Sequence, residues 1–587
     1  MISNYDKHPA IPISSRDKDC ATGWSAVCHT LQATMESHAR CVLAIECYPG
    51  TNLEELRVAL KSALHPNLVL LSDSAFKDPS ELEKIFAPSL GDDPVFGKMN
   101  AWQIEDFLSP ERVAELRHKI EAQKDGLILV LGTGASIVAG DWKVLIYADL
   151  TRWEIQQRQR AHQIGNLGAE NSASSLASLY KRAFFIDWRA ADRLKLSLLE
   201  KIDFFLDTNL PDDPRMIEGN LFRLALSKTC ERPFRVVPFF DPGPWGGEWM
   251  RSHFDLPKNP PNFAWCFDCV PEENSLRFSF GNQVVESPAL TLVHRHPREL
   301  LGEDVYRRFG AEFPIRFDFL DTVGGGNLSL QVHPLLAFLR EHYGLSYTQD
   351  ESYYLLDAEP DAVVYLGLKE GISQEEMAEK LVGAQAGLYD FPAEKYVNRW
   401  PVQKHSHVSI PAGTIHCSGR NAMVLEVSAT PYIFTFKLWD WGRMGLNGQP
   451  RPIHLKEGLT NIQWDRTTEW VRKNLIDRVR PIASGPGWRE ESTGLHEYEF
   501  LETRRHWFTQ PVEHNTHGTL NVLNLVEGTQ VIVESPTQAF EPFLVHYAET
   551  FIVPACVGAY TIRPVEKNGP TLGTLKAYVR SQSDGKL

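Results

Sequence analysis

The sequence predicts a multidomain protein in which a parallel α/β domain precedes a mainly β half. The chain has 587 residues, more than one hydrophobic core usually organises, so two to four domains are expected. Residues 40–228 alternate continuous apolar runs with helical periods. Beyond residue 231 the strand-like runs alternate in polarity and are punctuated by Gly and Pro, which favours antiparallel β structure.

The α/β domain is predicted from apolar runs that are continuous rather than alternating. These runs are Cys41–Ile45, Leu68–Leu71 and Leu127–Leu131, and a helical period at Leu53–Leu60 follows the first. A strand that is apolar on both faces is typical of a parallel sheet covered by helices. We therefore expect a parallel sheet within residues 40–228.

Two β domains are expected after it, over residues 232–450 and 480–587. The first carries a helical insertion at Ser373–Leu381, where Ser373 and Glu376 have the spacing of a capping box. The second repeats the strand and turn pattern over a shorter length.

Charge and cysteine content exclude several classes of function. The chain carries 60 Lys and Arg against 75 Asp and Glu, a net charge of -15, which disfavours binding to nucleic acid or to an anionic membrane. Among the nine Cys, the close pair Cys266 and Cys269 has no second pair to complete a four-ligand zinc site. Scattered Cys of this kind indicate a reducing compartment.

The N-terminal arm, residues 1–39, opens with a polar segment that lacks the apolar run of a signal peptide. The longest apolar stretch, Gly126–Gly140, is interrupted by Gly132 and Gly134 and is shorter than the ~18 residues of a spanning helix. We therefore expect a buried strand followed by a tight turn there, and a cytoplasmic protein.

Four residues in the β half form a candidate metal site. Alternation in Leu328–Pro334 places Gln331 and His333 on one face of a strand. Glu351 follows, and His416 comes just after a Pro-Gly turn. Two His, one Glu and Gln331 as a fourth ligand would leave a zinc ion an open position, as a catalytic site requires. A single His in a β-rich core is more often a hydrogen-bonded structural residue, but the joint pattern favours the metal site.

The same residues resemble a known family, the type I mannose-6-phosphate isomerases, which are zinc enzymes built on tandem cupin barrels. The segment Pro411-x-Gly413-x-x-His416 is similar to the second cupin motif, and the resemblance covers about residues 232–587. The matching segments are Pro244–Gly247, Phe313–Asp321, Leu328–Pro334, Glu351–Tyr354, Ile410–His416, Val424–Val427, Thr435–Arg443, Phe551–Pro554 and Gly558–Thr561.

The resemblance implies one zinc ion per chain, held by His333, Glu351 and His416 with Gln331 as the fourth ligand. Other divalent metals could occupy the same ligand set. The substrate it implies is a small sugar phosphate, most simply mannose 6-phosphate, converted to fructose 6-phosphate through an enediolate whose charge a metal can stabilise.

Two further residues are candidates for catalysis. Alternation puts Glu426 on the polar side of a strand near the same turn, where it is either a base or hydrogen-bond partner in the pocket or a salt-bridged structural residue. Lys437 stands where the family carries an arginine, so the charge is kept and the bidentate fork is lost.

Other departures from the family concern phosphate recognition. Leu335 replaces a usual acidic residue, and Ser346–Asp350 lacks a frequent lysine. His405 and His407 lie near the turn and either replace the lost charges or have no direct role. The second barrel has no His at its own turn, Pro554–Gly558, so it is expected to bind no metal and to cover the first barrel.

The N-terminal domain is similar to uridine-kinase-like P-loop proteins in Asp93–Gly97, Leu129–Ala135, Val144–Leu150 and the following arginines. Its first strand-to-helix turn, Glu46–Leu53, has no phosphate-loop lysine. The resemblance therefore implies a degenerate kinase-like domain that does not bind ATP, and the alternative is a plain α/β scaffold.

Three functions are consistent with the sequence. The first is a zinc-dependent aldose-ketose isomerase for mannose 6-phosphate and fructose 6-phosphate. The second is a metal-retaining sugar-binding or regulatory protein with little or no turnover, and the third is an isomerase for another sugar. The sequence does not fix the physiological sugar, the metal loaded in the cell, the oligomeric state or whether any nucleotide binds the N-terminal half.

Overall fold

The computed structural model describes residues 3–36, 38–429, 432, 434–448, 451–494, 499–566 and 569–580. The start of the predicted arm, and the ends of the predicted domains at residue 450 and residue 587, lie outside the described residues. The chain divides into two compact units. One comprises Ala10–Thr229 and Ser275–Arg295, and the other comprises Met1–Pro9, Cys230–Asn274 and His296–Leu587.

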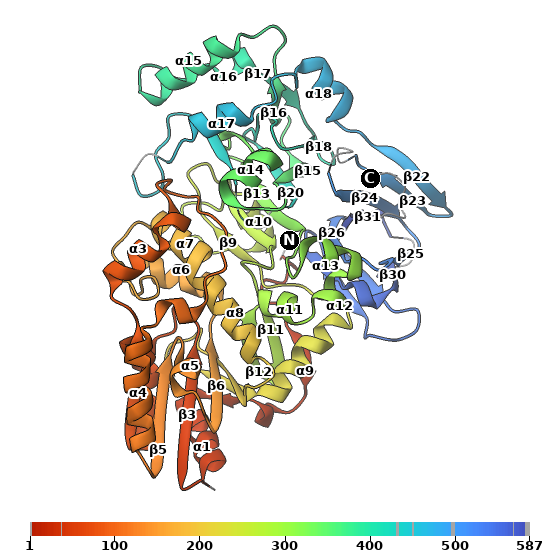
Figure 1. Ribbon diagram of the computed structural model, residues 1–587. Helices are drawn as coiled ribbons and strands as arrows, with labels where there is room; N and C mark the ends of the chain where they lie inside the picture. The colour runs from red at the N-terminus through yellow and green to blue at the C-terminus, as the bar shows by residue number, and fades with distance from the viewer. Residues whose placement is uncertain are drawn as a thin grey trace. The chain divides into compact units, whose positions relative to one another are not determined.

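The first of these, the α/β unit, is built on a seven-stranded sheet in the order β2-β8-β7-β6-β3-β5-β4 (Figure 1). Strands β4, β5, β3, β6 and β7 are parallel. Strand β8 pairs antiparallel with β7, and β2 pairs antiparallel with β8. The predicted parallel sheet is therefore confirmed. The strands are β2 (Ala21–Thr22), β3 (Arg40–Cys47), β4 (Leu68–Leu71), β5 (Gly126–Gly132), β6 (Val144–Asp149), β7 (Phe204–Asp207) and β8 (Arg215–Glu218).

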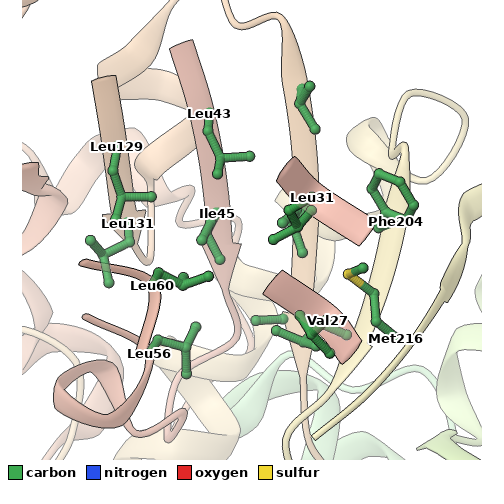
Figure 2. Packing of buried hydrophobic residues seen from close by; sticks show 14 of the residues in the cluster. Val27, Leu31, Leu43, Ile45, Leu56, Leu60, Leu129, Leu131, Phe204 and Met216 are labelled. Carbon is green, nitrogen blue, oxygen red and sulfur yellow. The ribbon is translucent and has the colours of Figure 1, made fainter. Parts of the chain in front are cut away.

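Helices cover this sheet because its strands are apolar on both faces. They are α1 (Gly23–Met35), α2 (Leu53–Leu64), α3 (Pro79–Leu90), α4 (Pro110–Ala122), α5 (Ala135–Ala139), α6 (Arg152–Arg160), α7 (Leu176–Arg182), α8 (Trp188–Leu198) and α9 (Gly219–Cys230). Figure 2 shows Leu43 of β3 and Leu129 of β5 in the same buried cluster as Leu31 of α1 and Leu60 of α2.

A segment from the later half of the chain completes the α/β unit. Strand β11 (Ser275–Phe280) pairs parallel with β1 (Ile11–Ser14) and antiparallel with β12 (Gln283–Pro288), and α11 (Leu290–Arg295) follows. The ammonium of Lys195 donates a 2.7 Å hydrogen bond to the hydroxyl of Thr291 in α11. Residues 275–295 are thus part of this unit although the chain enters and leaves them from the other.

The other unit, the β unit, contains two pairs of antiparallel sheets. The first pair has the orders β18-β15-β20-β13-β10-β9 and β17-β16-β19-β14-β21. Its strands are β9 (Phe239–Asp241), β10 (Trp265–Cys269), β13 (Arg316–Asp321), β14 (Leu330–Val332), β15 (Asp350–Ala358), β16 (Val363–Leu368), β17 (Val397–Pro401), β18 (His407–Ile410), β19 (His416–Ser418), β20 (Ala422–Ala429) and β21 (Phe436–Trp439).

The second pair has the orders β22-β23-β24-β31-β26-β29 and β25-β30-β27-β28. Its strands are β22 (Arg480–Gly485), β23 (Trp488–Ser492), β24 (Leu501–Phe508), β25 (Val512–Asn515), β26 (Asn521–Glu527), β27 (Gln530–Glu534), β28 (Phe543–His546), β29 (Thr550–Val553), β30 (Ala559–Pro564) and β31 (Leu572–Val579). Phe508, Leu523 and Phe551 belong to the apolar core of this pair. The predicted β-rich second half is confirmed.

Short helices connect these strands. They are α10 (Trp249–Phe254), α12 (Pro297–Leu301), α13 (Glu303–Phe309), α14 (Leu336–Tyr343), α15 (Gln374–Gln385), α16 (Ala393–Tyr396), α17 (Leu455–Asn461) and α18 (Thr468–Asn474). The predicted insertion is α15, and the hydroxyl of Ser373 accepts a hydrogen bond from the backbone N–H of Glu376 at 3.1 Å. Among the described residues, no helix combines the length and apolar character that crossing a bilayer requires.

Replacing Leu43 with Ala is expected to lower the free energy of unfolding of the α/β unit by about 3 kcal/mol, because it leaves a cavity at a fully buried site. Val58 on α2 is 52% exposed, so Val58→Ala should change that free energy by less than about 0.5 kcal/mol. Urea denaturation, monitored by the hydrogen exchange of peptides from β3 and β5, measures the change in the free energy of unfolding for both variants. Equal effects of the two substitutions would contradict the assigned core.

Candidate metal centre

Three buried side chains converge in the first pair of sheets of the β unit. The Nε2 atom of His333 lies 3.0 Å from Oε2 of Glu351, and Nε2 of His416 lies 2.9 Å from Oε1 of the same carboxylate. One candidate ligand atom of each residue lies within 4.8 Å of the other two. A single ion could therefore contact all three side chains.

The strand register brings these residues together. Gln331 in β14 is paired directly with His416 in β19, and His333 follows on the same face because side chains alternate along an extended chain. Glu351 comes from β15 in the other sheet of the pair. The two sheets thus face each other across the site.

The Pro-Gly turn fixes the position of His416 relative to His333. The backbone N–H of Gly413 donates to the carbonyl of His333 at 2.9 Å. Gly413 has a φ of +85°, and a Cβ atom there would lie 2.9 Å from Leu335 and 3.1 Å from the carbonyl of Asn461. Only glycine meets both requirements at low cost, which explains the glycine of the turn.

Backbone carbonyls fix the tautomer of both imidazoles. The Nδ1 atom of His333 lies 3.0 Å from the carbonyl of Phe434, and Nδ1 of His416 lies 2.8 Å from the carbonyl of Thr414. A carbonyl only accepts hydrogen bonds, so each Nδ1 carries a proton, and each ring, when neutral, presents a lone pair at Nε2. Both Nε2 atoms point at the Glu351 carboxylate, so either protons on Nε2 or a metal cation must lie between the rings and the carboxylate.

The electrostatics of the cluster also favour an anionic ligand set. Burial opposes ionisation of Glu351, but the positive charge of His333 and His416, when they are protonated, holds its pKa well below the usual range, and a divalent cation in the same place would act in the same direction with both rings neutral. The carboxylate therefore stays charged although it is fully buried. Two imidazole nitrogens and one carboxylate are donors that suit a divalent metal such as zinc, so the residues present fit the implied metal.

Gln331 lies at the edge of this cluster. Its amide nitrogen is 3.2 Å from Nε2 of His416. Rotation of the amide by half a turn would bring its oxygen to the same place, because the two ends of an amide have nearly the same shape. The predicted fourth ligand is therefore next to the three strong ones.

Lys437 lies one strand beyond Gln331 in the same sheet, so that His416, Gln331 and Lys437 form a row across three neighbouring strands. It lies in β21, paired directly with Gln331 of β14, so Lys437, Gln331 and His416 are neighbours on one face. Burial, together with the nearby charge of Arg451, lowers the pKa of Lys437 to about 7. The sequence placed Lys437 near the site, and the strand register gives the reason.

Glu426 lies on the same face of its sheet as Glu351. Strand β20 runs between β13 and β15, and Glu426 is paired with Asp318 on one side and Tyr353 on the other. Burial and the charges of Asp318 and Glu351 raise the pKa of Glu426 well above its usual range. Burial raises the pKa of Asp318 to about 7, so the two carboxyl groups hold at least one proton near neutral pH.

Asp318 was not singled out from the sequence. The sequence did contain a pattern that could have identified it. Arg316 and Asp318 alternate with apolar residues in Phe313–Asp321, and polar residues at a period of two mark one face of a strand. What the sequence did not show is that this face lies beside Glu426.

His405 and His407 lie on the other face of β15. His407 in β18 is paired with Tyr354, which points away from the face of Glu351 because neighbouring side chains alternate. Nδ1 of His405 is 2.9 Å from the hydroxyl of Tyr354, and Nε2 is 3.0 Å from Glu527. Burial lowers the pKa of His407 to about 3. These residues therefore do not supply positive charge to the metal cluster.

Comparison with known proteins gives two different results for the two halves of the chain. A family model described as a domain of unknown function (DUF8485) matches residues 23–231. The chain is 28% identical over 217 residues to the mannose-6-phosphate isomerase of Streptococcus mutans, covering 37% of this chain and 63% of that protein. It is 25% identical over 232 residues to mannose-6-phosphate isomerase ManA of Bacillus subtilis, covering 39% of this chain and 68% of that protein.

Among solved structures, the mannose 6-phosphate isomerase of Bacillus subtilis aligns with a TM-score of 0.47 at 18% identity, covering 59% of this chain and 99% of that one. That the first domain is kinase-like, and that the β unit forms tandem cupin barrels, stay predictions. The resemblance seen in the sequence is confirmed in its coarser form: over about 39% of its length the chain is homologous to the type I mannose-6-phosphate isomerases.

Proposed function

We propose that the chain is a zinc-dependent aldose-ketose isomerase that interconverts mannose 6-phosphate and fructose 6-phosphate. The observation that carries the proposal is the pair of imidazole Nε2 atoms aimed at one buried carboxylate, 3.0 Å and 2.9 Å away. Homology to mannose-6-phosphate isomerases supports it.

In this proposal His333, Glu351 and His416 hold one metal ion, and Gln331 is the fourth ligand. Three strong nitrogen and oxygen donors leave room for a substrate oxygen, as in catalytic zinc sites. A bound divalent cation would polarise the sugar carbonyl and offset the negative charge of an enediolate. The donor set favours zinc, and other divalent metals can bind the same ligands.

The proton that moves between C1 and C2 of the sugar needs a group that can hold it. We assign this role to Glu426, whose carboxyl group is on the face of Glu351 and is paired with Asp318. When the pair holds a single proton, its ionised carboxylate can take up a proton from the sugar and return it. Lys437, in the row of Gln331 and His416, supplies positive charge toward the oxygen atoms of the substrate.

A second candidate function is a metal-retaining sugar-binding protein with little turnover. One observation favours it. Burial and Arg451 lower the pKa of Lys437 to about 7, whereas an arginine at this position would keep its full charge and offer a planar fork of donors. The positive charge available to a substrate is therefore weaker than the family pattern provides.

His416→Ala is expected to abolish stoichiometric metal binding, because it removes one of three strong ligands from a buried cluster. Elemental analysis of the purified full chain measures the metal content. The matched control is His118→Ala, an exposed position in α4, which should keep one metal ion per chain. Full metal content in His416→Ala would show that the assigned site is wrong.

The zinc-loaded protein should convert mannose 6-phosphate to fructose 6-phosphate in a coupled assay. Chelation should remove the activity and added zinc should restore it, because the proposed reaction depends on the charge that the metal supplies. If the protein retains its metal and shows no turnover, the isomerase proposal fails and the sugar-binding function gains support.

Lys437→Arg is expected to raise kcat/KM for mannose 6-phosphate by about tenfold, which corresponds to about 1.4 kcal/mol of transition-state stabilisation. Lys473→Arg on α18, at an exposed position, is the matched control and should leave kcat/KM unchanged. Steady-state kinetics on both variants measures the effect. An unchanged or lower kcat/KM in Lys437→Arg would contradict the view that the lysine limits the reaction.

A further inference from the structure

The α/β unit contains a cavity that the proposed isomerase function does not use. It has a volume of about 480 Å³ and is lined by the β3–α2 loop, the segment after β4, Thr133 after β5, and the loop between α6 and α7. We call it the sheet-end cavity. It shares no residue with the metal cluster, and its volume is in the range of small-molecule sites, about 300 to 1,000 Å³.

The topology of the sheet explains why a cavity forms there. Strands β5 and β4 lie on one side of β3, and β6 and β7 lie on the other. The loops that leave the carboxyl ends of the strands therefore diverge beside β3. Open α/β sheets bind their ligands at such a reversal of strand order.

The places that would receive a phosphate here are already filled by acidic side chains. The carboxylate of Glu46 accepts hydrogen bonds from the backbone N–H groups of Gly134 and Ser136, at 2.6 Å and 2.9 Å, and from the Ser136 hydroxyl at 2.7 Å. The first turn of α2 carries Glu54 and Glu55, whose charges oppose an anion at that helix end.

The basic residues of the lining are engaged with the protein itself. Arg112 forms an ion pair with Asp78 at 2.7 Å, and the ammonium of Lys77 donates to the carbonyl of Asp106 at 2.8 Å. The lining also contains Asp73 and Glu170, both exposed. Acidic groups therefore outnumber basic ones around the cavity.

The hydroxyl groups of the lining are left as acceptors. Thr51, Thr133 and Ser74 donate their protons to the backbone carbonyls of Tyr48, Cys47 and Leu71, at 2.8 Å, 2.8 Å and 2.6 Å. A hydroxyl whose proton is used can only accept from a ligand. A phosphate group brings acceptors alone at neutral pH, so it would find no donor among these three hydroxyl groups.

From these contacts we propose that the sheet-end cavity binds an uncharged, hydroxyl-rich small molecule and excludes its phosphorylated form. The shared chemistry is that of a free sugar or a nucleoside, whose hydroxyl groups donate to the threonine, serine and Asp73 oxygens. A cationic amine is a poorer match, because the free carboxylates are exposed and water screens their charge.

Isothermal titration calorimetry of the full, zinc-loaded chain tests the proposal with mannose, fructose, uridine and adenosine as probes. At least one should bind saturably with one site per chain. The phosphate comparison is made on His416→Ala, because mannose 6-phosphate and fructose 6-phosphate are expected to bind at the metal centre of the unchanged chain. In that variant the monophosphate should bind at least about tenfold more weakly than the uncharged probe. The same titration on His416→Ala should give the same affinity for the uncharged probe, which separates this site from the metal centre and from the outcome of the isomerase assay.

Two variants locate the binding. Ser74→Trp, at an exposed position of the lining, fills the cavity and should lower the affinity by at least about tenfold. Asp73→Lys, combined with His416→Ala, should reverse the preference toward the phosphorylated probe. Glu83→Ala, an exposed position on α3 outside the lining, is the matched control and should bind as the unchanged chain does.

Three results would overturn the proposal. They are the absence of saturable binding by all four uncharged probes, binding that is unchanged in Ser74→Trp, and a preference of His416→Ala for the phosphorylated probe. A normal unfolding transition of each variant shows that a loss of binding reflects the cavity rather than the fold.

Discussion

Two backbone carbonyls determine the chemistry of the β unit. The carbonyls of Phe434 and Thr414 hold protons of His333 and His416 on Nδ1, so both Nε2 atoms face Glu351. With neutral rings and no cation this buried cluster costs stability, because the lone pairs and the carboxylate repel in a buried site. Metal binding would turn this cost into a gain, which couples the ion to the fold.

In the proposed function the two sheets around the cluster supply different groups. One sheet carries the row of His416, Gln331 and Lys437, which combines candidate metal ligands with a lysine. The facing sheet carries Glu351 and the carboxyl pair of Glu426 and Asp318. A substrate between the sheets would meet positive charge from one side and a proton-holding group from the other. The positive charge is the weakest part of this arrangement, because burial and Arg451 lower the pKa of Lys437 to about 7.

Local patterns in the sequence predicted much of this structure, and long-range pairing accounts for most of the rest. The continuous apolar runs became β3, β4 and β5 because strands buried on both faces need no polar alternation. Alternation in Leu328–Pro334 placed Gln331 and His333 on one face. By contrast, the pairing of β1 with β11 joins residues 11–14 to residues 275–280, and no local period encodes such a partner. The role of Glu46 also depends on a distant partner, the turn at Gly134.

The most direct test of the metal centre is anomalous X-ray diffraction from crystals of the zinc-loaded protein at the zinc absorption edge. The account predicts one peak per chain, about 2.0 to 2.2 Å from Nε2 of His333, Nε2 of His416 and a carboxylate oxygen of Glu351. A zinc-loaded crystal with no peak among these three residues, or with its peak at another site, would contradict it.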